Sequence, residues 1–469
     1  MKRTKRLYLL LGVLVVLSVA AFAVKHVQQE QARISISGEV VLDIDSADVT
    51  ALAWTYDNES LAFHKDGDGW TYDDDAAFPV DAEKIQALLS YFSEMGAAFI
   101  IEDADDLGQY GLDDPACTIT ITTDDGETTI NLGDYSTMDQ QRYLSTGDGN
   151  VYLVTSDPLS AYEIALADMI DNDDLPAFDQ VERISISGPE DYEVVYQAYE
   201  AENTTTICAD DVYYKQDGDT LAPLDTEKVE QYLAAVSGLS QDTYVTYNAT
   251  DDDLAAYGLD DPELTLHVDY TDDEDESATF TLTMSRDPET KAAAAEDDAE
   301  DTAGEGATDS DKVKAYVRIG DSSIIYEISE TSYNALMACT YNDLRHSDVF
   351  TGDVGDITRF DIGLDDTQYS FTADEDDGFS YNGEAIDLEN LTSALTALTI
   401  DSFTDETSDG LSEELRLTLG LDGVLPEQNY TFYRYDGDHC LLAVDGDSVG
   451  LVPRSQVVDL IEAINAVVL

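Results

Sequence analysis

Three segments of the chain repeat one spacing of apolar residues. In 85–95, apolar side chains recur at i, i+3, i+4, i+7 and i+10, which places them on one face of a helix. The segment 229–239 reproduces this spacing in full, and 391–398 reproduces its first four positions. An aspartate stands four residues before the first apolar position of each segment, and aspartate is a preferred helix N-cap. We therefore predict three capped amphipathic helices. Their cap residues are Asp81, Asp225 and Asp387.

Between the predicted helices, apolar and polar residues alternate along short segments. In 117–123, Cys117, Ile119 and Ile121 share one face, and the threonines between them share the other. Such alternation is typical of strands with one buried face, and Gly- and Asp-rich turns separate the segments. In each repeat, strands come first, the capped helix follows, further strands come next, and a second helix ends the repeat. This order predicts an α+β fold class with mainly antiparallel sheets.

The first two helices are each followed by the sequence Gly-Leu-Asp-Asp-Pro, which we interpret as a structural joint. Glycine can adopt a positive φ, leucine can anchor the turn in the core, the aspartates can cap backbone N–H groups, and proline can begin a strand. Asp387 lies 162 positions after Asp225, and the same offset from Gly258 leads to Gly420, where the motif is altered. The predicted joint residues are Gly111, Leu112, Asp113, Asp114, Pro115, Gly258, Leu259, Asp260, Asp261, Pro262, Gly420, Leu421 and Asp422.

The N-terminus combines a basic stub with an apolar segment. Residues 1–6 carry four Lys and Arg residues, and 7–24 is uncharged and close to the minimum length of a membrane-spanning helix. Basic residues stay on the cytoplasmic side, so we predict a single-pass anchor in the cell membrane with the C-terminal bulk outside the cytoplasm. The alternative is a signal peptide cleaved near the Ala-Phe-Ala at 21–23, which would release a secreted protein.

The repeats predict the domain organisation. Three repeated units of mainly antiparallel strands, with two helices each, follow the N-terminal transmembrane helix, and the altered joint makes the third unit degenerate. The second unit carries an Ala-, Asp- and Glu-rich insertion at 286–311, which we expect to be disordered because it has no periodic apolar face. The predicted boundaries are 1–6 for the basic cytoplasmic stub, 7–24 for the transmembrane anchor or signal segment, and 33–176, 177–350 and 351–469 for the units.

The charge of the chain restricts its partners. Lys and Arg number 22 against 101 Asp and Glu, which gives a net charge of −79. A nucleic acid would be repelled, and the sequence has no basic stripe to overcome this repulsion. The charge keeps an exported protein soluble, and it also leaves open the binding of a cationic ligand or a cell-wall polymer.

The sequence offers little catalytic chemistry. Its cysteines form no C-x-x-C pair, which removes zinc ribbons and thioredoxin-like redox motifs, and leaves either disulfides in three possible connectivities or buried apolar residues. Its histidines follow no metal-ligand or triad pattern, and the usual fingerprints of hydrolases and nucleotide-binding proteins are missing. We predict no enzyme activity, no catalytic residue, no cofactor and no metal site. The residues concerned are Cys117, Cys208, Cys339, Cys440, His26, His64, His267, His346 and His439.

Five short motifs together resemble a known family. They are Gly-Trp-Thr-Tyr at 69–72, Pro-Val-Asp-Ala-Glu-Lys at 79–84, Leu-Gly-Gln-Tyr-Gly-Leu-Asp-Asp-Pro at 107–115, Leu-Gly at 132–133 and Val-Tyr-Leu-Val at 151–154. With the N-terminal segment, they look like the domain of unknown function 4340 family. The resemblance implies a membrane-tethered extracytoplasmic protein, often encoded beside ABC transporters of the gliding-motility auxiliary type, with no assigned catalytic residues.

We therefore expect a noncatalytic accessory protein whose partner is an ABC transporter permease or another envelope protein. The alternative is a secreted or surface binding module for a cationic ligand or a cell-wall polymer.

Overall fold

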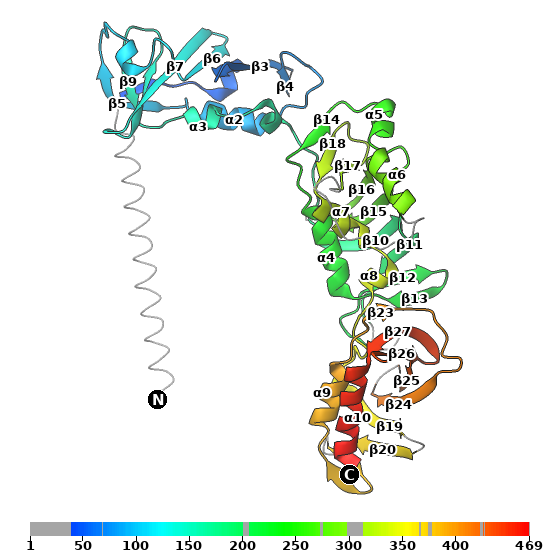
Figure 1. The fold of residues 1–469 in the computed structure, drawn as a ribbon. Helices are drawn as coiled ribbons and strands as arrows, with labels where there is room; N and C mark the ends of the chain where they lie inside the picture. The colour runs from blue at the N-terminus through cyan, green and yellow to red at the C-terminus, as the bar shows by residue number, and fades with distance from the viewer. Residues whose placement is uncertain are drawn as a thin grey trace, which may run out of the picture. The chain divides into compact units, whose positions relative to one another are not determined.

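The computed structural model in Figure 1 describes residues 39–468, except 68, 200–205, 273–274, 298–312, 365–366, 374–377, 423–424 and 426. The chain divides into two compact units, Met1–Asp173 and Asp174–Leu469. The first unit holds one nine-stranded sheet and the second holds two, and all three sheets are antiparallel.

The predicted α+β class is wrong, because the chain is mostly β, with 43% strand against 22% helix. Sequence periodicity detects the longer central strands, but the edge strands, of two to four residues, have too few positions to show a period. The expected two helices per unit are also wrong for the second sheet, whose segment of the described chain contains five, α4 to α8. The predicted transmembrane segment, 7–24, lies outside the described residues, and no helix within them is long and apolar enough to cross a membrane.

The first sheet has the order β1-β5-β9-β8-β7-β6-β2-β3-β4. Its strands are β1 (Glu39–Leu42), β2 (Val49–Tyr56), β3 (Glu59–Asp66), β4 (Gly69–Tyr72), β5 (Met95–Ile101), β6 (Cys117–Thr123), β7 (Gly126–Ser136), β8 (Gln141–Ser145) and β9 (Val151–Val154). The helices of this unit are η1 (Ser46–Asp48), α2 (Ala82–Ser90), η2 (Gly108–Tyr110), α3 (Leu159–Tyr162) and η3 (Leu166–Met169).

The second sheet has the order β13-β12-β11-β10-β15-β16-β17-β18-β14. Its strands are β10 (Gln180–Ser187), β11 (Tyr192–Tyr196), β12 (Tyr213–Asp217), β13 (Thr220–Pro223), β14 (Tyr244–Thr246), β15 (Leu264–Thr271), β16 (Ser277–Arg286), β17 (Ala315–Ile319) and β18 (Ile325–Ile328). Its helices are α4 (Thr226–Ser237), α5 (Asp251–Ala256), α6 (Pro288–Asp297), α7 (Glu330–Met337) and α8 (Tyr341–Leu344).

The third sheet has the order β22-β21-β20-β19-β24-β25-β26-β27-β23. Its strands are β19 (Ile357–Leu364), β20 (Thr367–Ala373), β21 (Phe379–Tyr381), β22 (Glu384–Ile386), β23 (Ser402–Phe403), β24 (Ser412–Leu421), β25 (Glu427–Arg434), β26 (His439–Val444) and β27 (Asp447–Pro453). Its helices are η4 (Val354–Asp356), α9 (Glu389–Thr396) and α10 (Arg454–Val468).

Eight strands take equivalent positions in the three sheets. The order β5-β9-β8-β7-β6-β2-β3-β4 in the first corresponds to β14-β18-β17-β16-β15-β10-β11-β12 in the second and to β23-β27-β26-β25-β24-β19-β20-β21 in the third. The ninth strand differs, because β1 pairs with β5, whereas β13 and β22 pair with β12 and β21 at the opposite edge. Along the chain, α2, α4 and α9 lie between equivalent strands, namely β4 and β5, β12 and β14, and β21 and β23. The repeated element is therefore one sheet with its helix.

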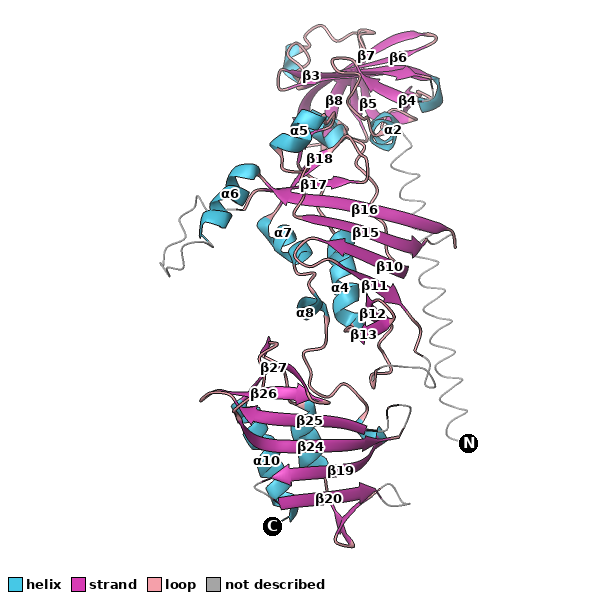
Figure 2. Cartoon of the chain, turned by 90° about the vertical axis from the view of Figure 1, so that its right-hand side faces the viewer, coloured by secondary structure: helices cyan, strands magenta, loops and turns pink. Residues whose placement is uncertain are grey.

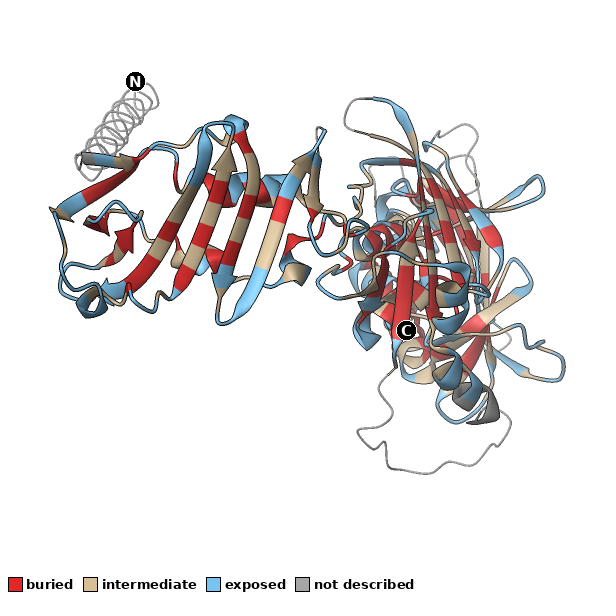
Figure 3. Ribbon diagram, turned by 90° about the horizontal axis from the view of Figure 1, so that it is seen from above, coloured by how far each residue is buried: buried red, intermediate tan, exposed pale blue. Residues whose placement is uncertain are grey.

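The buried residues alternate along the strands, as the predicted pattern requires (Figure 3). In the first sheet, Trp54 stacks on Phe63 with ring centroids 5.5 Å apart and meets the edge of Tyr162 at 5.4 Å. In the third sheet, α10 lies on one face (Figure 2), where Val457, Leu460 and Ile464 are fully buried in the core. Helices therefore cover one face of the third sheet, and the polar residues of its strands lie on the other face.

Part of the insertion that was expected to be disordered is helical. Arg286 ends β16, and α6 begins at Pro288, where the carboxylate of Asp287 accepts hydrogen bonds from the backbone N–H groups of Glu289 and Thr290. A capped start and a run of alanines, the best helix former, explain this helix. The rest of the predicted insertion, from residue 298, lies outside the described residues.

Candidate functional site

The first two predicted joints have the backbone that their sequence requires. Gly111 and Gly258 have φ values of 69° and 73°, and the leucine that follows each is buried. A Cβ on Gly111 would lie 2.7 Å from Asp134 Cγ, so the close packing as well as the left-handed backbone excludes a side chain. The paired aspartates of both motifs, Asp113, Asp114, Asp260 and Asp261, are exposed.

The third joint lies elsewhere than predicted. Gly420 is inside β24, where it pairs with Arg359 and Glu427, and Leu421 ends the strand. The turn before β24, the strand equivalent to β6 and β15, contains Gly410, which has a φ of 83° and lies two residues before the strand. Asp387 is only 23 positions from Gly410, whereas Asp225 is 33 positions from Gly258, so a fixed offset from the helix could not find it.

The predicted helix caps hold two helices in the same way and the third differently. The carboxylates of Asp81 and Asp225 each accept hydrogen bonds from two backbone N–H groups of the first turn of α2 and α4. Asp387 lies one residue before the N-cap position of α9 and accepts one hydrogen bond, from Glu389 N at 2.9 Å.

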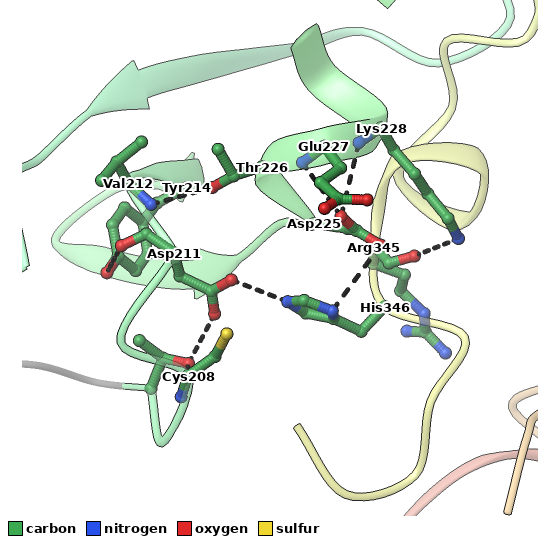
Figure 4. A network of polar contacts seen from close by, with 11 residues as sticks. Cys208, Asp211, Val212, Tyr214, Asp225, Thr226, Glu227, Lys228, Arg345 and His346 are labelled. Atoms are coloured by element: carbon green, nitrogen blue, oxygen red, sulfur yellow. Dashed lines mark hydrogen bonds and ion pairs between the residues drawn. The ribbon is translucent and has the colours of Figure 1, made fainter. Parts of the chain in front are cut away.

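Asp225 belongs to a polar cluster in the second unit that joins three chain segments (Figure 4). Cys208 and Asp211 lie on the loop before β12, Asp225 begins α4, and His346 follows α8. His346 Nε2 donates a hydrogen bond to Asp211 Oδ1 at 2.7 Å, and its Nδ1 lies 3.7 Å from Asp225 Oδ2. Both ring nitrogens of one histidine therefore face carboxylates.

Hydrogen bonds fix the loop that carries Cys208 and Asp211. Asp211 is 1% exposed, and its Oδ2 accepts a hydrogen bond from Thr206 Oγ1 at 2.6 Å. The hydroxyl of Tyr214 donates to the backbone carbonyl of Asp211 at 3.1 Å, and Cys208 N donates to Thr206 Oγ1 at 3.1 Å. A buried carboxylate with these partners has a defined position without being exposed to solvent.

The electrostatic setting favours positive charge at His346. Its burial acts to lower the pKa of the imidazole, but the neighbouring carboxylates, above all Asp211, outweigh burial and raise it. Burial also raises the pKa of the Cys208 thiol, to about 11, and the charge of Asp211 adds to this effect. Cys208 is therefore a protonated thiol, and a cysteine nucleophile would need the opposite shift.

The two permanent cations nearest to the cluster are directed to other partners. Lys228 Nζ donates hydrogen bonds to the carbonyl of Arg345 at 2.8 Å and to Ser347 Oγ at 2.7 Å. The guanidinium of Arg345 lies 3.7 Å from the centroid of the Phe403 ring and donates to the carbonyl of Val449 at 3.0 Å. Neither side chain neutralises the carboxylates around His346.

A cavity of about 240 Å³ opens beside the cluster. It is lined by Cys208, Asp210, Asp211, Asp225, Thr226, Glu227, His346, Asp348 and Thr351. The Cys208 thiol, a carboxylate oxygen of Asp211 and a ring nitrogen of His346 lie within 4.8 Å of one another, and each is an atom that could hold a metal ion. The sequence did not indicate this group, because His346 is 135 positions from Asp211 and no local spacing connects them.

The first unit has the same backbone framework with different side chains. Lys84 Nζ donates to the carbonyl of Ile170, just as Lys228 donates to that of Arg345. The backbone N–H of Asp81 donates to Met169 O, and that of Asp225 donates to Leu344 O. In this framework the residue equivalent to His346 is Asp171.

These features define a class of protein built from tandem antiparallel sheets with helices on one face. The family described as Domain of unknown function (DUF4340) matches residues 70–220 and 215–417, which is most of the chain. The chain belongs to this family, and the predicted resemblance is confirmed. The two matches begin in the equivalent strands β4 and β12. No curated protein and no solved structure matches the chain.

Proposed function

We propose that the protein is a noncatalytic, exported accessory protein that holds an envelope protein, such as the permease of an ABC-type transporter. The observation that carries this proposal is the open face of the first sheet, which is opposite to the face that contains Trp54. We define this open face by five partly exposed residues at its centre. They are Ala51, Ala53, Thr118, Thr120 and Thr129.

The register places these residues side by side. Ala53 pairs with Thr120, and Thr120 pairs in turn with Thr129 on the next strand. Thr118 Oγ1 donates to Asn131 Oδ1 at 3.1 Å, so some of the hydroxyl groups already have partners within the sheet. The centre of the open face is therefore uncharged and made of short side chains.

An uncharged patch has a specific meaning in a chain with a net charge of −79. Charged residues are depleted at the centre of protein interfaces because their desolvation is costly. None of the five defining residues carries a charge, so a partner protein that covers them desolvates no carboxylate among them. The acidic residues elsewhere would keep the chain soluble and prevent self-association.

The sequence supports a place outside the cytoplasm. Basic residues precede the uncharged segment at 7–24, which is the arrangement of an export signal. The family resemblance implies a neighbouring ABC transporter, which is why we name a permease as the expected partner.

The test is crosslinking and affinity purification of the full-length chain from its native membranes, followed by mass spectrometry. We expect recovery of a permease with the wild-type chain and its loss with A53E, because this substitution places a carboxylate on the open face. A76E is the matched control, because Ala76 lies in an exposed turn of the same unit. Tryptophan emission would verify that both variants fold.

Equal recovery of the permease with A53E and A76E would contradict the role of the open face. Recovery of wall polymer in place of a protein would favour the alternative binding module, and binding that survives high salt would show specific contacts rather than charge alone.

A further inference from the structure

We propose that Cys208, Asp211 and His346 form a binding site for one zinc-class transition-metal ion. This proposal goes beyond the accessory function and rests on different residues. Thiolate sulfur, imidazole nitrogen and carboxylate oxygen are the three donor types that zinc takes from proteins. Calcium and magnesium prefer oxygen alone, so the sulfur and the nitrogen select a softer ion.

The distances fit this coordination after small side-chain rotations. Zn–S bonds of about 2.3 Å and Zn–N or Zn–O bonds of about 2.0–2.2 Å separate tetrahedral donor atoms by roughly 3.3–3.7 Å. The three donors here lie within 4.8 Å of one another. Metal binding would release two protons to solvent, the one on the Cys208 thiol and the one that His346 Nε2 now donates to Asp211 at 2.7 Å.

The surrounding groups are placed as an outer shell. A histidine that binds metal through one ring nitrogen usually donates the other N–H to a carboxylate, which fixes the ring. His346 Nδ1 faces Asp225 Oδ2 at 3.7 Å, on the opposite side of the ring from Asp211. Thr206 Oγ1 donates to the second oxygen of Asp211, so the remaining Oδ1 points to the site.

The cavity favours a cation and gives it access. Its lining includes five carboxylates, from Asp210, Asp211, Asp225, Glu227 and Asp348, and among the described lining residues only His346 can carry positive charge. Cys208 is partly exposed to solvent. Three protein donors leave a fourth position open toward the cavity, which is the arrangement of zinc sites that bind water or a further ligand.

The test is zinc titration of the full-length chain after treatment with a chelator, in excess Mg²⁺ to occupy surface carboxylates. Bound metal would be measured by plasma mass spectrometry, and affinity by competition with a chromophoric chelator. We expect one zinc ion per chain that Mg²⁺ does not displace. C208S and H346Q should lose this ion, whereas H439Q, at a partly exposed histidine that also faces two carboxylates, should retain it.

The role of Asp225 as a positioning residue has a matched control. Asparagine caps helices about as well as aspartate, so D225N keeps the start of α4 while it removes the carboxylate behind His346. We expect D225N to weaken zinc binding by about 10–100-fold. D81N changes the equivalent cap of α2 and should leave zinc affinity unchanged.

A spectroscopic measurement keeps the proposal testable if a variant does not fold. Cobalt bound to the wild-type chain should show a thiolate-to-metal charge-transfer band, because Cys208 is a ligand. A cobalt complex without this band would overturn the proposal. So would zinc that Mg²⁺ displaces, or equal zinc retention by the wild type, C208S and H346Q, since the cluster would then be only an ion-pair network.

Discussion

Replacing Gly111 by alanine tests whether the repeated joint depends on a left-handed glycine. At a φ of 69°, an L-residue costs about 1–2 kcal/mol. The added Cβ would also lie 2.7 Å from the side chain and 2.9 Å from the backbone nitrogen of Asp134, and such overpacking costs about 1–3 kcal/mol. Alanine restricts the unfolded chain, which offsets about 0.4–1 kcal/mol. We expect a net destabilisation of about 1–4.5 kcal/mol.

The two tryptophans make this effect measurable in the full chain. Trp54 and Trp70 both lie in the first unit, and Trp54 is 3% exposed, so tryptophan emission reports the unfolding of that unit alone. With a urea dependence of about 2 kcal/mol per molar, G111A should lower the unfolding midpoint by about 0.5–2 M.

The control is G410A, at the third joint. Gly410 has a φ of 83°, but no atom lies within 4 Å of its added Cβ, and it belongs to the second unit. The tryptophan transition of G410A should therefore match that of the wild type. A G111A midpoint indistinguishable from the wild-type midpoint would refute the view that this joint needs glycine.

Three further predictions concern stability and reactivity. E263Q should destabilise the second unit by about 2 kcal/mol, because Glu263 is 10% exposed and accepts two hydrogen bonds from the Arg286 guanidinium. Burial acts to raise the pKa of Glu263, but Arg286 outweighs burial and lowers the pKa. The stability that the Glu263 carboxylate contributes is therefore present above the unfolded pKa of about 4.3 and is lost as the pH falls through the folded pKa. Urea unfolding followed by circular dichroism should show the stabilities of the wild type and E263Q converging in acid, and a difference that stays constant with pH would contradict this prediction. D81A should lower the free energy of unfolding of the first unit by about 1 kcal/mol, measured by tryptophan emission. D387A should lower the free energy of unfolding of the second unit by less, measured by circular dichroism, because it loses one hydrogen bond. Equal decreases would contradict the different cap positions. Burial raises the pKa of Cys117 to about 12, so a thiol reagent at pH 8 should label it only in urea, as mass spectrometry would detect; labelling of the native chain would refute its burial.

The sequence predicts the repeated elements better than it predicts their class. The apolar spacing in 85–95 and 229–239 predicts α2 and α4 with their buried faces, and the alternation in 117–123 corresponds to β6. Both helices end before the last predicted positions, because Met95 begins β5 and Leu239 follows α4. The β content was underestimated because strands such as β14 and β23 have only three and two residues. The strands β14 and β23 form because they pair with β18 and β27, and no local sequence pattern indicates that pairing.

The candidate site was not predictable for a related reason. Cys208 and Asp211 are three positions apart, which resembles many spacings without function, and His346 reaches them only because α8 ends beside α4. The helix cap at Asp225 was visible in the sequence, but its second role beside His346 depends on this tertiary contact. Local motifs therefore located one part of the cluster and its framework, and tertiary structure supplied the rest.

The internal copies separate what the fold requires from what is specific to one unit. The backbone hydrogen bond of the cap residue and the lysine bond to a carbonyl occur in both the first and second units, so they belong to the framework. Asp171 takes the place of His346 in the first unit, which shows that the framework forms without a histidine at this position. The group of Cys208, Asp211 and His346 is thus an addition to the second copy, and among the described residues it is the one group of this kind. We therefore expect one metal ion per chain rather than one per repeat, so a stoichiometry of two or three would contradict the proposed site as clearly as a stoichiometry of zero.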